Sequence, residues 1–338
     1  MLNTLQFLHG QLLQTPALPT TPLPNSTIIV TGANSGLGLD ACKHLLRLQC
    51  ATIIMAVRSV EKGEAARQEV LDSAPKAGSK AKTTIDVWPL DLTSYASVAS
   101  FADRAATLPR LDAAILNAGV DLTEFSLAES LETTLTVNVT STFLLALLLL
   151  TTLRATATKY KCLPHIAIVG SAVHFWANTK SLTGIVPGEN MLKSLSVKDT
   201  AMMKERYFLS KLLVMLCVRQ LTSLLTESSK SEHNPKPLVI VNNVAPGYCA
   251  TSLFRHDDSM ATRVSLKVLG RSSEEGSRTL VHGATAGRES HGAYLSECMV
   301  KKASAWVRSA EGEKVGKRVW AEVMEVAERV RPGVGSEI

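Results

Sequence analysis

Short apolar runs alternate with helical segments along most of the chain. Runs that predict strands stand at residues 27–31, 52–57, 84–91, 112–117, 165–171 and 237–244. One segment with helical capping or spacing begins at residue 36. Four more cover residues 60–73, 97–107, 127–156 and 206–226. Strands that are apolar throughout and separated by helices are typical of a parallel sheet covered on both faces. The pattern therefore predicts one α/β domain with a doubly wound parallel sheet.

The two ends of the chain and two long connections depart from this alternation. Residues 1–24 end in "ALPTTPLP" and predict a short helix followed by an extended N-terminal arm. Long connections at the carboxyl ends of strands tend to form binding loops, so we expect a substrate loop over 172–205 and a lid over 247–290. Valines at helical spacing predict a C-terminal helical extension over 299–338. The catalytic domain would then span 25–298.

Composition and charge argue against several kinds of protein. The net charge of +6 is spread along the chain, so we expect no nucleic-acid partner. The six cysteines lack the spacing of a disulfide framework or a zinc site, which favours a reducing compartment and no metal. The run "FLLALLLL" at 143–150 is far shorter than the ~20 residues that a membrane span needs. The start of the chain has no basic region typical of a signal peptide. We expect a soluble cytoplasmic protein with no transmembrane segment.

A glycine-rich turn, "TGANSGLG", directly follows the first strand and opens the first helix. Its first glycine permits a tight turn, its second lets the backbone approach a pyrophosphate, and its third allows close helix packing. The helix N-terminus presents free N–H groups and a positive dipole end to the phosphates. In this position the motif predicts a Rossmann-type dinucleotide site. The residues expected to contact the dinucleotide are those of the turn: Gly32, Asn34, Ser35, Gly36, Leu37 and Gly38.

The end of the second strand favours NADP(H) over NAD(H). NAD-binding folds place an acidic residue there for the ribose hydroxyls, whereas this strand ends with Val57 and is followed by Arg58. A carboxylate would repel a 2′-phosphate, and a guanidinium can bind it. A solvated loop arginine is the alternative explanation of Arg58.

Seven short motifs resemble those of the short-chain dehydrogenase/reductase superfamily, in the family's order. They are "TGANSGLG" (31–38), "LDL" (90–92), "NAG" (117–119), "VNVTS" (137–141), "VGS" (169–171), "YFLSK" (207–211) and "PGYCAT" (246–251). The resemblance runs through most of the chain, apart from the first 24 residues and the C-terminal segment. It implies an NADP(H)-dependent oxidoreductase that interconverts a carbonyl and an alcohol on a small-molecule substrate.

The resemblance implies a catalytic role for four residues. Tyr207 would be the general acid/base on the substrate oxygen. A tyrosine has an ordinary pKa of ~10, so Lys211, one helical turn later, would stabilise the phenolate. Lys211 would also hold the nicotinamide ribose, and both residues would belong to the cofactor site. Ser171 would donate a hydrogen bond to the substrate oxygen, and Asn138 would hold a water that links Lys211 to solvent. Each of these four residues, taken alone, could also have a purely structural role.

Further cofactor contacts follow from the same resemblance. Asp91 would contact the adenine, while Asn117 and Gly119 would border the cofactor and steady the central sheet. Gly247 and Thr251 would belong to the segment that binds the nicotinamide carboxamide.

The long connection between Ser171 and Tyr207 resembles the retinol-dehydrogenase-like branch of the superfamily. "GRESHGAYLS" (287–296) and "EGEKVGKRVW" resemble fungal reductases of that branch, many of which belong to specialised-metabolite pathways. A ketoreductase or dehydrogenase that acts on a bulky apolar metabolite would fit. Large apolar side chains of the two long connections favour such a substrate, although they could equally pack the loops onto the body. These are Phe175, Trp176, Met202, Met203, Leu253 and Phe254.

Two other functions stay open at this point. A regulator that senses NADP without chemistry would usually lack the tyrosine or the lysine, and both are present. An enzyme that uses the same site for a non-redox step, such as dehydration or cyclisation, would retain them. The leucine-rich stretch 143–150 and the Tyr207 helix are where relatives form dimers, so a homodimer is also open.

Overall fold

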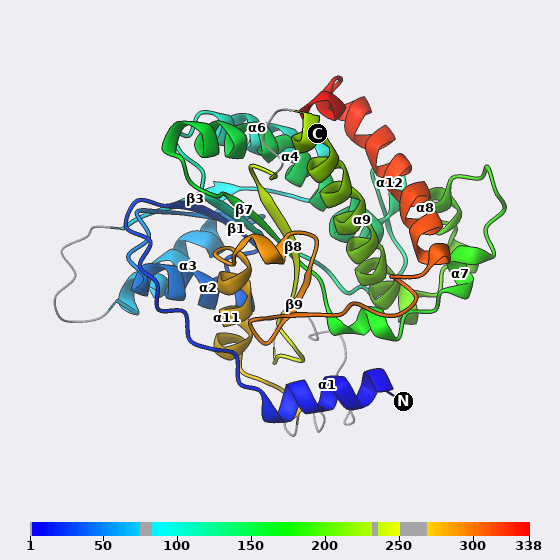
Figure 1. Ribbon diagram of the computed structural model, residues 1–338, viewed down its shortest axis with the longest axis horizontal. Coiled ribbons are helices and arrows are strands. Elements are labelled where there is room, and N and C mark those ends of the chain that lie inside the picture. Colours follow the sequence, from blue (N-terminus) through cyan, green and yellow to red (C-terminus); the bar gives the residue numbers. More distant parts are fainter. Residues whose placement is uncertain (1, 75–82, 232–235, 251–268) are drawn as a thin grey trace.

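In the described part of the chain, eight strands form a mostly parallel sheet in the order β10-β9-β8-β7-β4-β1-β2-β3 (Figure 1). The structure is a computed structural model, and it describes residues 2–74, 83–231, 236–250 and 269–338. The strands are β1 (Thr27–Thr31), β2 (Thr52–Val57), β3 (Thr84–Pro89), β4 (Ala113–Leu116), β7 (His165–Val169), β8 (Ile240–Ala245), β9 (Tyr294–Ser296) and β10 (Met299–Lys301). Neighbours pair in parallel except β10, which runs antiparallel to β9. The predicted α/β class with a doubly wound sheet is confirmed.

Helices cover both faces of the sheet (Figure 1). Those of one face are α2 (Gly36–Arg47), α3 (Val60–Asp72) and α11 (Ser273–Gly283), and those of the other are α4 (Tyr95–Ala106), α6 (Thr142–Tyr160) and α9 (Met203–Ser231). Helix α12 (Ala310–Val330) packs along α9 and also touches α6. Ile28 and Val30 of β1 lie in one core and Ile29 in the other. This alternation is what the two-residue period of a strand buried on both sides produces.

The helix expected over 127–156 begins later than predicted. Strands β5 (Leu127–Ala128) and β6 (Leu131–Glu132) form a short hairpin, followed by α5 (Thr133–Leu135), a π-helical turn (Thr136–Ser141) and α6. The hairpin turn consists of Glu129 and Ser130, with φ of 53° and 68°. Glycine and asparagine favour this left-handed backbone, and neither is present to mark the turn.

Strands β9 and β10 were also not predicted. Each has three residues, and their turn uses Glu297 and Cys298, again with positive φ (51° and 57°) and without glycine. The boundary expected after residue 298 falls at this turn.

The segment expected to form the substrate loop, 172–205, contains η2 (Ala172–Phe175), α7 (Lys180–Thr183), α8 (Met191–Ser194) and η3 (Lys198–Thr200). The described residues of the segment expected to form a lid, 247–290, include α11 and η5 (Arg288–Ser290), while Thr251, Leu253 and Phe254 lie outside the described residues. That these segments bind substrate stays a prediction.

The N-terminal residues form helix α1 (Leu2–Leu13), which is followed by an irregular segment that leads to β1, as predicted. A short 3₁₀ helix, η6 (Val334–Glu337), lies close to the C-terminus. The helical segments Thr133–Tyr160 and Met203–Ser229 are long and apolar enough to cross a membrane, but their most apolar windows are 89% and 72% buried inside the fold. Both segments are core helices of the α/β domain.

Candidate active site

The sequence-predicted site residues follow the carboxyl ends of neighbouring strands. The glycine turn follows β1, Asn117 follows β4, Ser171 follows β7, and Gly247 follows β8. Parallel strands end at the same edge of a sheet, so the fold brings these segments together at the place where α/β proteins bind ligands. Tyr207 and Lys211 reach the same edge from α9.

The glycine turn is shaped as a phosphate cradle. Gly32 and Gly36 have φ of +64° and +52°, in the left-handed region. A Cβ at Gly38 would lie 2.4 Å from the Gly32 carbonyl oxygen, so α2 can start this close to β1 only with glycine there. The Asn117 amide donates to the Thr31 carbonyl at 2.9 Å and ties the end of β4 to the turn. These residues fit a dinucleotide because α2 begins at Gly36 within the turn, and a helix N-terminus presents N–H groups and a positive dipole end to phosphates.

Tyr207 is a buried phenol at the centre of the site. It is 8% exposed and hydrogen-bonded to the side chain of Ser171. Burial raises the pKa of Tyr207 well above its usual 10, the Asp121 carboxylate raises it further, and the bond to Ser171 opposes both. The tyrosine is therefore neutral and carries its proton.

Lys211 is buried beside Tyr207. Its ammonium nitrogen lies 5.5 Å from the centre of the Tyr207 ring and donates to the Val169 carbonyl at 2.8 Å. Burial lowers the pKa of Lys211 to about 8, and the Asp121 carboxylate opposes that shift. At neutral pH the ammonium is mostly charged. Asp121 was missed by the sequence reasoning, although an acidic residue two positions after the "NAG" motif, past the end of a core strand, was a usable signal.

Asn138 lies in the π-helical turn and braces the loop after β4. Its amide oxygen accepts from the Val120 N–H at 2.9 Å, and its amide nitrogen donates to the Val120 carbonyl at 2.9 Å and to Ser210 at 3.0 Å. A Cβ at Gly119 would stand 3.1 Å from the Asn138 oxygen and 3.6 Å from the Lys211 ammonium. Asn138, Gly119 and Lys211 are therefore neighbours. π-Turns are frequent at functional sites, and the water relay through Asn138 stays a prediction.

The remaining predicted cofactor residues lie around this centre. Arg58 is exposed just after β2. Asp91 accepts hydrogen bonds from the backbone N–H and the hydroxyl of Thr93, at 2.9 and 2.7 Å, and so caps its own turn. Gly247 has a φ of +89°, and Thr251 lies outside the described residues. Among the described residues, no group of three or more His, Cys, Asp or Glu side chains could hold a metal ion.

His174 is a structural histidine rather than an exposed one. It is 3% exposed, its Nδ1 lies 2.7 Å from the Ser171 carbonyl, and its Nε2 accepts from the Ser304 N–H at 3.3 Å. Burial lowers the pKa of His174 to about 4, so the ring is neutral and its Nδ1–H donates to Ser171.

The large apolar residues of the substrate loop divide into two groups. Phe175 packs against His174 and Tyr294, with ring centroids 4.2 and 5.9 Å away. Trp176 is 39% exposed, and its ring packs edge-on against Phe7 of α1 with centroids 5.3 Å apart. Met202 is 51% exposed. Most of these side chains thus pack the loop onto the rest of the chain, and Met202 presents apolar surface to solvent.

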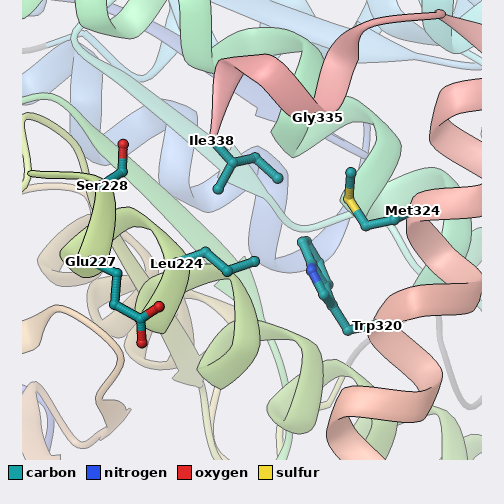
Figure 2. Close-up of a pocket in the computed structure, with 7 residues that line it drawn as sticks. All are labelled: Leu224, Glu227, Ser228, Trp320, Met324, Gly335 and Ile338. Atoms are coloured by element: carbon teal, nitrogen blue, oxygen red, sulfur yellow. The ribbon is translucent and has the colours of Figure 1, made fainter. Parts of the chain in front are cut away.

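A groove of about 380 Å³ lies between α9, α12 and the C-terminal residues (Figure 2). It is lined by Leu224, Glu227, Ser228, Trp320, Met324, Gly335 and Ile338. Leu224 and Tyr207 lie on the same helix, ~25 Å apart at 1.5 Å of rise per residue. The groove is therefore distinct from the cluster of Tyr207, Lys211 and Ser171.

The fold and the glycine turn define a dinucleotide-binding α/β protein of the Rossmann type. A family model described as short chain dehydrogenase matches residues 26–159. The short chain dehydrogenase/reductase dmxR8 of Cryptosporiopsis sp. is 37% identical and covers 98% of this chain and 99% of its own length. The short-chain dehydrogenase anuD of Penicillium roqueforti is 36% identical, covering 99% of this chain and 86% of its own. The chain belongs to the short-chain dehydrogenase family and is an NAD(P)-dependent short-chain oxidoreductase.

Solved structures share the fold at low identity. A crystal structure of an uncharacterized protein from Mycobacterium Paratuberculosis superposes with a TM-score of 0.65 at 22% identity, over 93% of this chain and 98% of that one. The Pseudomonas aeruginosa RhlG/NADP active-site complex gives 0.56 at 22% identity, over 81% and 95%. The resemblance of the sequence to fungal members of the family is confirmed by the relatives.

Proposed function

We propose that the protein interconverts a carbonyl and an alcohol with NADP(H), using Tyr207, Lys211, Ser171 and Asn138. The observation that carries this proposal is the buried phenol of Tyr207, hydrogen-bonded to Ser171 and beside the Lys211 ammonium, at the strand edge that also bears the glycine turn. A bound nicotinamide supplies or accepts the hydride. The chain's own residues handle the substrate oxygen and its proton.

In the direction of reduction, Tyr207 gives its proton to the substrate oxygen. Ser171 donates a hydrogen bond to the same oxygen and polarises the carbonyl. The phenolate that remains is stabilised by the Lys211 ammonium, which reaches over its ring. Asn138 and Gly119 form the wall beside Lys211, and a water held there would return the proton from solvent.

NADP(H) is supported by Arg58, which stands exposed at the end of β2, where a carboxylate would exclude a 2′-phosphate. The RhlG complex, whose fold is similar, binds NADP. The exposed Met202 favours a bulky apolar substrate, and the fungal relatives fit a role in specialised metabolism. A homodimer through α6 and α9 is disfavoured because α12 lies over both helices.

The test is a panel of ketones, aldehydes and quinones mixed with the protein and either NADPH or NADH. We expect loss of the reduced-nicotinamide absorbance with NADPH, and a higher kcat/KM than with NADH. Tyr207→Phe removes the acidic proton and should lower kcat by at least ~10³-fold, while the Kd of NADPH stays within about twofold. Retained turnover in this variant would contradict the assigned mechanism.

The same panel separates the other two functions. Product formation without loss of NADPH absorbance would favour a non-redox step on the same site. NADPH binding without any product would favour a sensing role. The buried, protonated Tyr207 beside Ser171 and Lys211 supports catalysis over a sensing role, and the absorbance readout separates redox from non-redox chemistry.

A further inference from the structure

Helix α1 lies outside the catalytic domain that the sequence predicts, yet it carries a buried glutamine that bonds the chain after β8. Gln11 is only 7% exposed. Its side-chain oxygen accepts from the Tyr248 N–H at 3.0 Å, and its nitrogen donates to the carbonyls of Tyr248 at 3.0 Å and Leu269 at 2.7 Å. The amide group of Gln11 thus pairs with the peptide groups of Tyr248 as a neighbouring strand would.

A second buried side chain, that of Arg271, links the N-terminal segment to the backbone near Tyr248. The Arg271 guanidinium donates to the carbonyls of Gly10 and Gln14 in the N-terminal segment and is paired with Glu297 at 2.9 Å. The backbone N–H of Arg271 donates to the Tyr248 carbonyl at 2.8 Å. Three segments far apart in sequence therefore meet at Tyr248.

Gly247 lies directly against the side chains of Gln11 and Arg271. A Cβ at Gly247 would lie 2.5 Å from Arg271 Nη1 and 2.8 Å from Gln11 Oε1, and its φ of +89° also disfavours a side chain. The conformation of residues 246–249 thus depends on Gln11 and Arg271.

Residues 246–249 lie between the glycine turn and Tyr207. A Cβ at Gly276 would stand 2.8 Å from a methyl carbon of Leu37, 3.3 Å from Pro246 and 2.4 Å from the sulfur of Cys249, so these three side chains gather over α11. The Cys249 thiol is near enough to Tyr207 to affect the pKa of the phenol. The segment therefore spans the distance from the phosphate cradle to the reacting end of the site.

We propose that Gln11 is a positioning residue that holds residues 246–249 against the nicotinamide half of the dinucleotide, which makes helix α1 part of the cofactor site. The inference rests on the proposed function. It assigns the N-terminal helix a role in nicotinamide binding, through contacts with the backbone of Tyr248 rather than with the cofactor itself.

The inference is tested by comparing two ligands. NADPH has a nicotinamide, whereas adenosine 2′,5′-bisphosphate has the adenine-side phosphates and no nicotinamide. Their Kd values are measured by calorimetry for the wild type and for Gln11→Ala. We expect the Kd of NADPH to rise about tenfold, because two or more hydrogen bonds to the segment are lost, and the Kd of the bisphosphate to stay within about twofold.

Gln11→Asn and Leu12→Ala complete the design. Asparagine keeps the amide group, with its donor and its acceptor, on a side chain one methylene shorter, so it should raise the Kd of NADPH less than alanine does, and it serves if the alanine variant does not fold. Leu12 is the neighbouring residue and is 56% exposed, so its variant should bind both ligands as the wild type does.

An unchanged ratio of the two Kd values in both Gln11 variants would overturn the inference, whether both constants rise together or neither does. Failure of the wild type to bind NADPH would instead overturn the proposed function. The two failures are distinguishable, since the first appears only in the variants.

Discussion

At the scale of single residues, burial decides the protonation of the site. Tyr207 and Lys211 are both almost fully removed from water, and burial disfavours the charged form of each. The pKa of the tyrosine is raised and that of the lysine is lowered, while the Asp121 carboxylate raises both. The resting site therefore holds a proton on Tyr207, as the proposed role of an acid in reduction requires.

Asp121→Asn should shift the pH dependence of reduction. Reduction needs the protonated phenol and the charged Lys211, so the rate falls as the pH rises through their pKa values. Because Asp121 raises the pKa of both groups, its removal lowers both, and the alkaline limb of log(kcat/KM) should move to lower pH. The pH–rate profile of both proteins measures this. A limb that stays in place or moves to higher pH would show that Asp121 does not act on the Tyr207–Lys211 pair.

At the scale of elements, a buried ion pair joins the helix of Asn138 to the helix of Tyr207. Glu132, at the start of α5, is fully buried and accepts from the N–H groups of Thr134 at 2.8 Å and Leu135 at 3.3 Å. The Arg206 guanidinium lies 3.4 Å from the same carboxylate and donates to the Leu195 carbonyl at 2.7 Å. The Glu132 carboxylate thus caps the N-terminus of α5 and balances the charge of Arg206, the residue before Tyr207.

Glu132→Gln is expected to destabilise the fold by about 3 kcal/mol, because it leaves the Arg206 charge buried without its partner. Urea unfolding measures the change. Glu124→Gln is the matched control, since Glu124 is an exposed residue nearby, and it should change the free energy of unfolding by no more than about 0.5 kcal/mol. Equal stability of the two variants would show that the ion pair contributes nothing.

At the scale of the whole molecule, histidines removed from water make the fold sensitive to acid. Three of them, His44, His165 and His174, are buried, and His282 and His291 are half-buried. Burial lowers the pKa of all five. Each is depressed below its unfolded value of 6.5, so the unfolded chain binds more protons. The stability that these residues confer is fully present above about pH 6.5 and is lost as the pH falls through their folded pKa values.

The free energy of unfolding should therefore fall between pH 7.5 and pH 5. His174, with a pKa of about 4, would account for roughly 2 kcal/mol of the loss at pH 5. Urea unfolding at both pH values measures it, and His174→Gln should reduce the difference between the two pH values by about that amount. If the variant and the wild type lose the same free energy, His174 is not the titrating group.

The parts of the fold and site that depend on local pattern could be predicted from the sequence. Apolar runs and helical spacing located the strands of the sheet interior and the helices between them. The glycine turn and the one-turn spacing of Tyr207 and Lys211 could be predicted because each motif lies within a single strand–turn–helix unit or helix. The hairpins at Glu129 and Glu297 could not be predicted, because residues without a turn signature adopt positive φ there only when the surrounding fold holds them.

Contacts between residues far apart in the chain could not be predicted, because they depend on how the elements pack. Gln11 and Tyr248 are 237 positions apart, and no periodicity or motif relates them. Asp121 reaches Tyr207 and Lys211 because separate strands end at one edge of the sheet, and burial at that edge then sets the two pKa values. Local propensity specifies elements one at a time. Packing of those elements places the charges and hydrogen bonds on which the chemistry depends.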